Sequence, residues 1–236
     1  MTSSKSEQYK MVRVGLLLFG IGFGILLVAS FIMVPLGWAS AYGLQSVTIL
    51  LGLAGGLLGV TLGFLACLIA PSSREKIPLL LGGGCVTIFT LVAILYWIQT
   101  APMMYSAQGR PPNTFFVKVA APTLFYCALI GGPLCFAVYC RMVGHAVGGS
   151  TLKKFALATI IVYLISIGIC IVFAIGMTLY FRANGNHFPH GDYGYDEIVV
   201  GFQLLGIANL AMFLALSVIG AYATTPSVLT KVDQNE

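Results

Sequence analysis

The chain has 236 residues, of which 58% are hydrophobic and only 8% are Asp, Glu, Lys or Arg. Its mean hydropathy of +0.96 lies far outside the range of water-soluble globular domains and excludes such a domain as the main body of the protein. The formal net charge of +5 does not indicate nucleic-acid binding, because the basic residues form no stripe and no recognised nucleic-acid module.

Six long apolar runs follow one another along the chain, and most of the charged residues lie between them. Each run is long enough to cross a bilayer as a helix, which takes about 20 apolar residues. The runs lack the period-2 alternation of membrane β-barrel strands. The sequence therefore predicts an all-α membrane protein with six transmembrane helices in a single domain, residues 1–236. The predicted spans are 14–36, 46–70, 78–98, 119–140, 155–180 and 198–222, and the predicted polar, mobile tails are 1–10 and 224–236.

The first run has an alternative interpretation as a signal peptide. It follows a basic N-terminus, and Ala39-Ser40-Ala41 after it resembles a cleavage site. Cleavage there would leave five spans. The apolar stretch exceeds the 7–15 residues of a signal sequence, so we predict a transmembrane span instead.

Basic residues fall mainly on one side of the predicted membrane. The positive-inside rule assigns that side to the cytoplasm, which places both termini there, as an even number of spans requires. The nine basic residues on this side are Lys5, Lys10, Arg13, Arg74, Lys76, Arg141, Lys153, Lys154 and Lys231. The three on the other side are Arg110, Lys118 and Arg182.

Glycines at four-residue spacing line one face of the second span. Such a face lets another helix approach closely, and close packing is what holds helices together in lipid. We predict that spans one and two pack tightly within one subunit. Association between subunits and a pore-lining face are the alternatives. The glycines concerned are Gly52, Gly55, Gly56, Gly59 and Gly63.

The fourth span carries Gly131, Gly132 and Pro133 near its middle. Pro133 has no N–H, so the carbonyl of Leu129 loses its helical partner. The pattern predicts a kink or a broken helix. In transporters, broken helices at this depth build solute sites, whereas many proline kinks are purely structural.

The third connection on the outer side, residues 182–197, is the most polar part of the chain. His187, His190 and Asp192 could bind a divalent metal there. Their spacing matches no standard metal motif, and the Gly, Asn and Pro content also fits ordinary turns with solvated histidines. No outer connection has an N-x-S/T acceptor. This fits a bacterial cytoplasmic membrane protein.

The cysteines and histidines give little sign of a cofactor. All six cysteines lie in or at the ends of apolar runs, with no CxxC pair, and we expect small buried side chains rather than disulfides. No predicted span contains a histidine, which argues against an intramembrane haem with two histidine ligands. It does not exclude contact with a cofactor held by another chain, and the cofactor stays unassigned. The cysteines are Cys67, Cys85, Cys127, Cys135, Cys140 and Cys170.

The uncharged spans, short loops and glycine face favour a non-catalytic subunit or assembly factor of a larger membrane complex. Its partners would be the lipid bilayer and other membrane subunits or further copies of itself. One alternative is a channel or transporter for a neutral solute or a gas, lined by Thr90, Tyr126, Ser166, Gln203 and Asn209. A metal-binding or enzymatic role of the outer loop is a second alternative. The sequence points to no catalytic residue.

Overall fold

A computed structural model describes residues 9–38, 42–69, 73–105, 121–183 and 194–233. Within these ranges the chain is helical and has no strand, which confirms the predicted all-α class. The helices are α2 (Lys10–Trp38), α3 (Tyr42–Cys67), α4 (Ser73–Tyr105), α5 (Ala121–Ala146), α6 (Ser150–Ala183), α7 (Gly194–Ala223) and α8 (Pro226–Asp233).

Helices α2 to α7 coincide with the six predicted spans to within a few residues at most ends and extend past several of them. Among the described residues, three helices contain stretches long and apolar enough to cross a membrane. These stretches are Lys10–Ile32 in α2, Ser150–Met177 in α6 and Gly201–Ala223 in α7. The shorter apolar stretch Gly55–Cys67 lies in α3. This composition fits a membrane protein.

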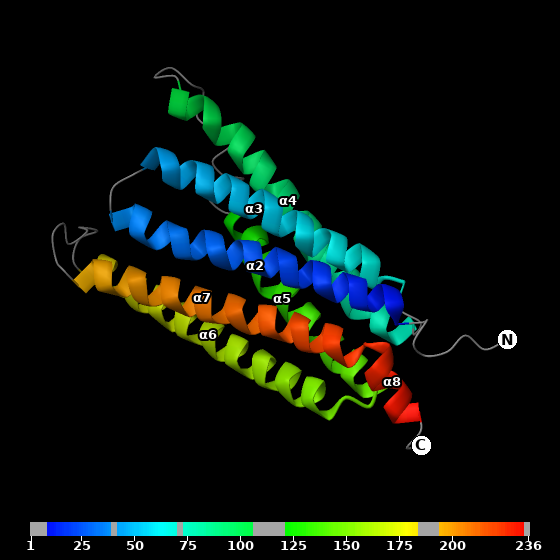
Figure 1. Cartoon of the computed structure of the whole chain (residues 1–236). Helices are drawn as coiled ribbons and strands as arrows, with labels where there is room; N and C mark the ends of the chain where they lie inside the picture. The colour runs from blue at the N-terminus through cyan, green and yellow to red at the C-terminus, as the bar shows by residue number, and fades with distance from the viewer. Residues whose placement is uncertain (1–8, 39–41, 70–72, 106–120, 184–193, 234–236) are drawn as a thin grey trace.

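The six long helices form a closed ring. Helix α2 packs most extensively on α3 and also on α7, while α5 packs on α4, α6 and α7. Contacts between α3 and α4 and between α6 and α7 close the ring. Figure 1 shows the helices running side by side and the two chain termini at the same end of the bundle.

The region predicted as a polar C-terminal tail contains the short helix α8. Pro226 occupies its first position, where a missing N–H leaves no helical hydrogen bond unmade. Leu229 is only 1% exposed. The predicted tail therefore includes a helix with a buried apolar side chain, and its mobility remains a prediction.

An aromatic cluster fills the middle of the ring. Its rings come from five of the six long helices, so side chains rather than a pore occupy the centre at this level. The Phe19 and Phe136 ring centroids are 4.2 Å apart, and Tyr163 meets Phe213 edge-on at 5.2 Å. The members are Phe19, Phe23, Phe64, Phe136, Tyr163 and Phe213.

A tight turn of three residues joins α5 to α6. Gly148 has φ of 68°, the left-handed conformation that glycine adopts without steric cost. The amide of Val147 donates to the Val143 carbonyl at 2.9 Å and thereby satisfies a group at the end of α5. The turn keeps α5 and α6 antiparallel and adjacent.

The five glycines of the predicted packing face all approach α2 of the same chain. A Cβ atom added at Gly59 would lie 2.8 Å from the Gly22 Cα, and one at Gly63 would lie 2.9 Å from the Phe19 ring. Gly52 faces Ala29, Gly55 faces Ile25 and Gly56 faces Leu26. That these contacts hold the two helices together remains a prediction.

Candidate functional site

Helix α5 continues through Gly131, Gly132 and Pro133 as a single helix, so the chain is not broken at these residues. A Cβ atom at Gly131 would lie 2.8 Å from the Cys85 Sγ, and one at Gly132 would lie 3.6 Å from Val86. The glycines thus allow α4 to approach α5 closely. A solute site formed by these three residues remains a prediction.

Two cavities adjoin the middle of α5. The smaller, of about 130 Å³, touches Gly132 and Pro133 and is lined by apolar side chains, including Phe19, Phe64 and Phe136. It offers no hydrogen-bonding side chain to a polar solute. The neighbouring cavity is larger and carries polar groups.

The larger cavity, of about 660 Å³, is a cleft between α5, α6 and α7. Its volume falls within the range of small-molecule sites in proteins. Most of its wall is apolar, and the Phe173 and Phe202 rings pack 4.5 Å apart within it. The lining side chains that carry an oxygen, nitrogen or sulfur atom are Tyr163, Ser166, Cys170 and Asn209.

Ser166 on α6 and Asn209 on α7 form the polar part of this wall. The Ser166 hydroxyl lies 2.9 Å from the Val162 carbonyl and 3.4 Å from the Asn209 Oδ1. A hydroxyl has one proton, and the shorter contact takes it. The Asn209 Nδ2 donates to the Leu205 carbonyl at 3.0 Å. The Asn209 Oδ1 is therefore left with acceptor capacity toward the cleft.

The residues predicted to line a solute path are only partly brought together. Ser166 and Asn209 meet, although they are 43 residues apart in sequence. Gln203 is exposed and lies outside the cleft. The side chains of Thr90 and Tyr126 lie outside the part of the chain whose side chains are described.

The predicted metal ligands His187, His190 and Asp192 also lie outside the described residues. Elsewhere in the described ranges, no three His, Cys, Asp or Glu side chains are grouped so that they could hold a metal ion. Of the cysteines described, Cys67 and Cys140 are buried as expected, Cys85 and Cys135 are half-buried, and Cys170 is exposed at the cleft. The expectation that all cysteines are buried is wrong for Cys170, because its stretch of α6 packs little against other helices.

A second polar cluster was missed by the sequence analysis. Glu75 lies between two cationic residues in the first turn of α4. It is only 4% exposed, and its Oε1 accepts a hydrogen bond from the Tyr9 hydroxyl at 3.1 Å. Tyr139 from α5 is completely buried and lies near Glu75 and Cys67. An amphipathic pattern could not reveal this cluster, because its members come from different helices.

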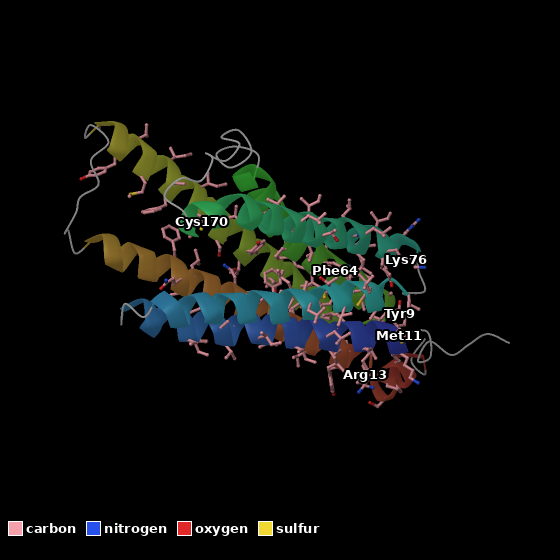
Figure 2. All side chains as sticks on the ribbon, turned by 90° about the horizontal axis from the view of Figure 1, so that it is seen from above. Tyr9, Met11, Arg13, Phe64, Lys76 and Cys170 are labelled. Carbon is pink, nitrogen blue, oxygen red and sulfur yellow. The ribbon has the colours of Figure 1, made fainter. Side chains whose placement is uncertain are left out.

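The cleft and the polar cluster around Glu75 lie toward different ends of the bundle. Figure 2 shows Tyr9, Arg13 and Lys76 at the end near the chain termini, while Cys170 lies toward the other end with Phe64 between them. The aromatic cluster separates the two sites.

Comparison with known proteins assigns no family to this chain: no family model, curated protein or solved structure matches it.

Proposed function

We propose that the protein is a six-span membrane protein with both termini in the cytoplasm. The positions of the basic side chains support this topology. Lys10 and Arg13 begin α2, Lys76 begins α4 and Arg141 lies near the end of α5, and these helix ends share the side of the bundle that carries both termini. Such an accumulation of positive charge is typical of a cytoplasmic face.

We further propose that the cleft binds a small neutral molecule with an apolar body and one hydrogen-bond donor, such as a hydroxyl or amide N–H. The observation that carries this proposal is the acceptor capacity of the Asn209 Oδ1 in a wall that is mostly apolar. A polar group surrounded by apolar surface fixes the orientation of a ligand and selects for it. Binding of this kind would serve a carrier or a sensor of such molecules.

Replacing Asn209 by Leu is expected to reduce binding of the molecule about 2- to 10-fold, because one hydrogen bond contributes about 0.5–1.5 kcal/mol net. The measurement is native mass spectrometry of the protein purified in mild detergent, with quantification of retained small molecules. Gln203→Leu is the matched control, since it removes an amide from the same helix outside the cleft. Equal retention by the Asn209→Leu variant, or no retained molecule in the wild type, would contradict the proposal.

A second candidate function is that of a non-catalytic subunit in a larger membrane complex. The exposure of α6 supports it, since Ile165, Val172 and Leu179 on this helix are 57%, 71% and 61% exposed. A partner helix on this face would form the additional packing. We expect other membrane proteins to co-purify in fixed stoichiometry after gentle solubilisation. A stable, isolated monomer that retains its small molecule would instead favour the cleft as the site of function.

A further inference from the structure

Polar side chains from four helices meet at the end of the bundle that carries the chain termini. Tyr9 directly precedes α2, Cys67 ends α3, Glu75 lies in the first turn of α4 and Tyr139 lies on α5. All four are buried, and Cys67 and Tyr139 are completely so. A site at this position is independent of the cleft, which lies beyond the aromatic cluster.

Only one of the two Glu75 carboxyl oxygens has a hydrogen-bond partner among the described residues. Its Oε1 accepts from Tyr9, but its Oε2 is buried without a hydrogen-bond partner among the described residues. Arg74 and Lys76 flank it in sequence, yet neither forms an ion pair with it in the described ranges. An unpaired carboxylate is expensive to bury, whereas a protonated carboxyl is not.

Tyr139 presents the second unsatisfied atom. Its hydroxyl is buried and makes no hydrogen bond within the described part of the chain. The neighbouring Cys67 thiol already donates to the Val12 carbonyl at 3.7 Å. Among the described residues, the titratable groups around Glu75 are the phenol of Tyr9, which is hydrogen-bonded to it, and the phenol of Tyr139, with the thiols of Cys67 and Cys140 near Tyr139. None of them carries a positive charge that would hold Glu75 ionised.

We propose that Glu75 is a proton-binding site, protonated on its Oε2 while Tyr9 is packed on the bundle, with Tyr139 as the hydrogen-bonding partner of that proton directly or through one water molecule. Loss of the proton leaves a negative charge in a buried space, and this weakens the contact of Tyr9, directly before α2, with the first turn of α4. The site thereby links proton uptake at this end of the protein to the contact between Tyr9 and Glu75.

The titration behaviour expected of the carboxyl agrees with this geometry. Burial raises the pKa of Glu75, and the hydrogen bond from Tyr9 opposes the rise. Burial also raises the pKa of Tyr9, and the nearby Glu75 raises it further. Tyr9 therefore keeps its proton and remains a hydrogen-bond donor. The pKa of Glu75 is higher in the folded chain than its unfolded value of about 4.3. Protonation of Glu75 therefore contributes its full stabilisation of the folded state below that pH. This stabilisation is lost as pH rises through the folded pKa.

Infrared difference spectroscopy of the full chain in lipid nanodiscs tests the proposal. The chain has only seven Asp and Glu residues. The infrared absorption of one carboxylic acid that stays protonated above the pH range in which glutamate ordinarily titrates can therefore be distinguished from that of the others. We expect the wild type to show this absorption and to lose it in one titration step. Glu75→Gln removes the absorption, whereas Glu197→Gln, at the start of α7 near the opposite end, retains it.

Two further variants separate a proton-binding role from a purely structural one. Tyr9→Phe removes a donor that favours the ionised carboxyl, so it should move the titration midpoint upward. Tyr139→Phe removes the acceptor of the Glu75 proton, so it should move the midpoint downward. Tyr222→Phe, at a tyrosine that is 68% exposed, should leave it unchanged. The proposal is overturned if all carboxyls of the wild type titrate in the ordinary range. It is equally overturned if neither buried tyrosine affects the midpoint.

Discussion

Replacing Phe136 by Ala is expected to lower the free energy of unfolding by about 2–4 kcal/mol. Truncation of buried aromatic side chains costs about 3–5 kcal/mol in water-soluble cores. The loss should be somewhat smaller here, because helices that separate in lipid remain in an apolar medium, and the missing packing contacts are the main cost. Phe136 is completely buried, and its ring lies 4.2 Å from Phe19 and 5.4 Å from Phe23.

The measurement is reversible unfolding in mixed micelles, followed by circular dichroism. Phe31→Ala is the control, since Phe31 lies on α2 but is 56% exposed. Its removal should cost well under 1 kcal/mol, as is usual for surface positions. If the two variants are equally stable, the aromatic cluster is not the centre of packing.

The helices themselves were predictable from the sequence, because a bilayer demands long uncharged runs and the runs are unambiguous. α6 is the clearest case: its predicted span, 155–180, lies wholly within Ser150–Ala183. The uninterrupted path of α5 through Pro133 was less predictable. A proline removes one helical hydrogen bond, but the residues that pack around the freed carbonyl decide whether the helix ends there.

The candidate sites were largely not predictable. Glu75 stands between Arg74 and Lys76, a pattern typical of a solvated connection, and only the fold brings Tyr9, 66 residues away, onto it. Ser166 and Asn209 were recognised as polar residues within spans. That they meet across one cleft depends on how α6 and α7 are rotated, and nearly uniform apolar helices carry little information about rotation.

Replacing Gly22 by Ala is expected to destabilise the protein by about 1–3 kcal/mol, the usual cost of overpacking. A Cβ atom there would lie 2.8 Å from the Gly56 carbonyl oxygen and 2.8 Å from the Val60 amide nitrogen. Both are backbone atoms of α3, so no side chain can rotate away, and α2 and α3 must move apart. Helix propensity favours Ala over Gly by about 1 kcal/mol, so a net loss would show that the contact outweighs propensity.

Gly24→Ala provides a control two residues away on the same helix. Outside the neighbouring turns of α2, no atom of the described residues lies within 4 Å of a Cβ placed at Gly24, and the variant should be neutral or more stable by up to about 1 kcal/mol. The same pair of variants distinguishes the two interpretations of the glycine face when oligomeric state is measured by sedimentation in detergent. If the face holds α2 to α3 within one chain, Gly22→Ala lowers the unfolding free energy and leaves the oligomeric state unchanged. If it joined two copies, the variant would dissociate a dimer while each chain kept its stability.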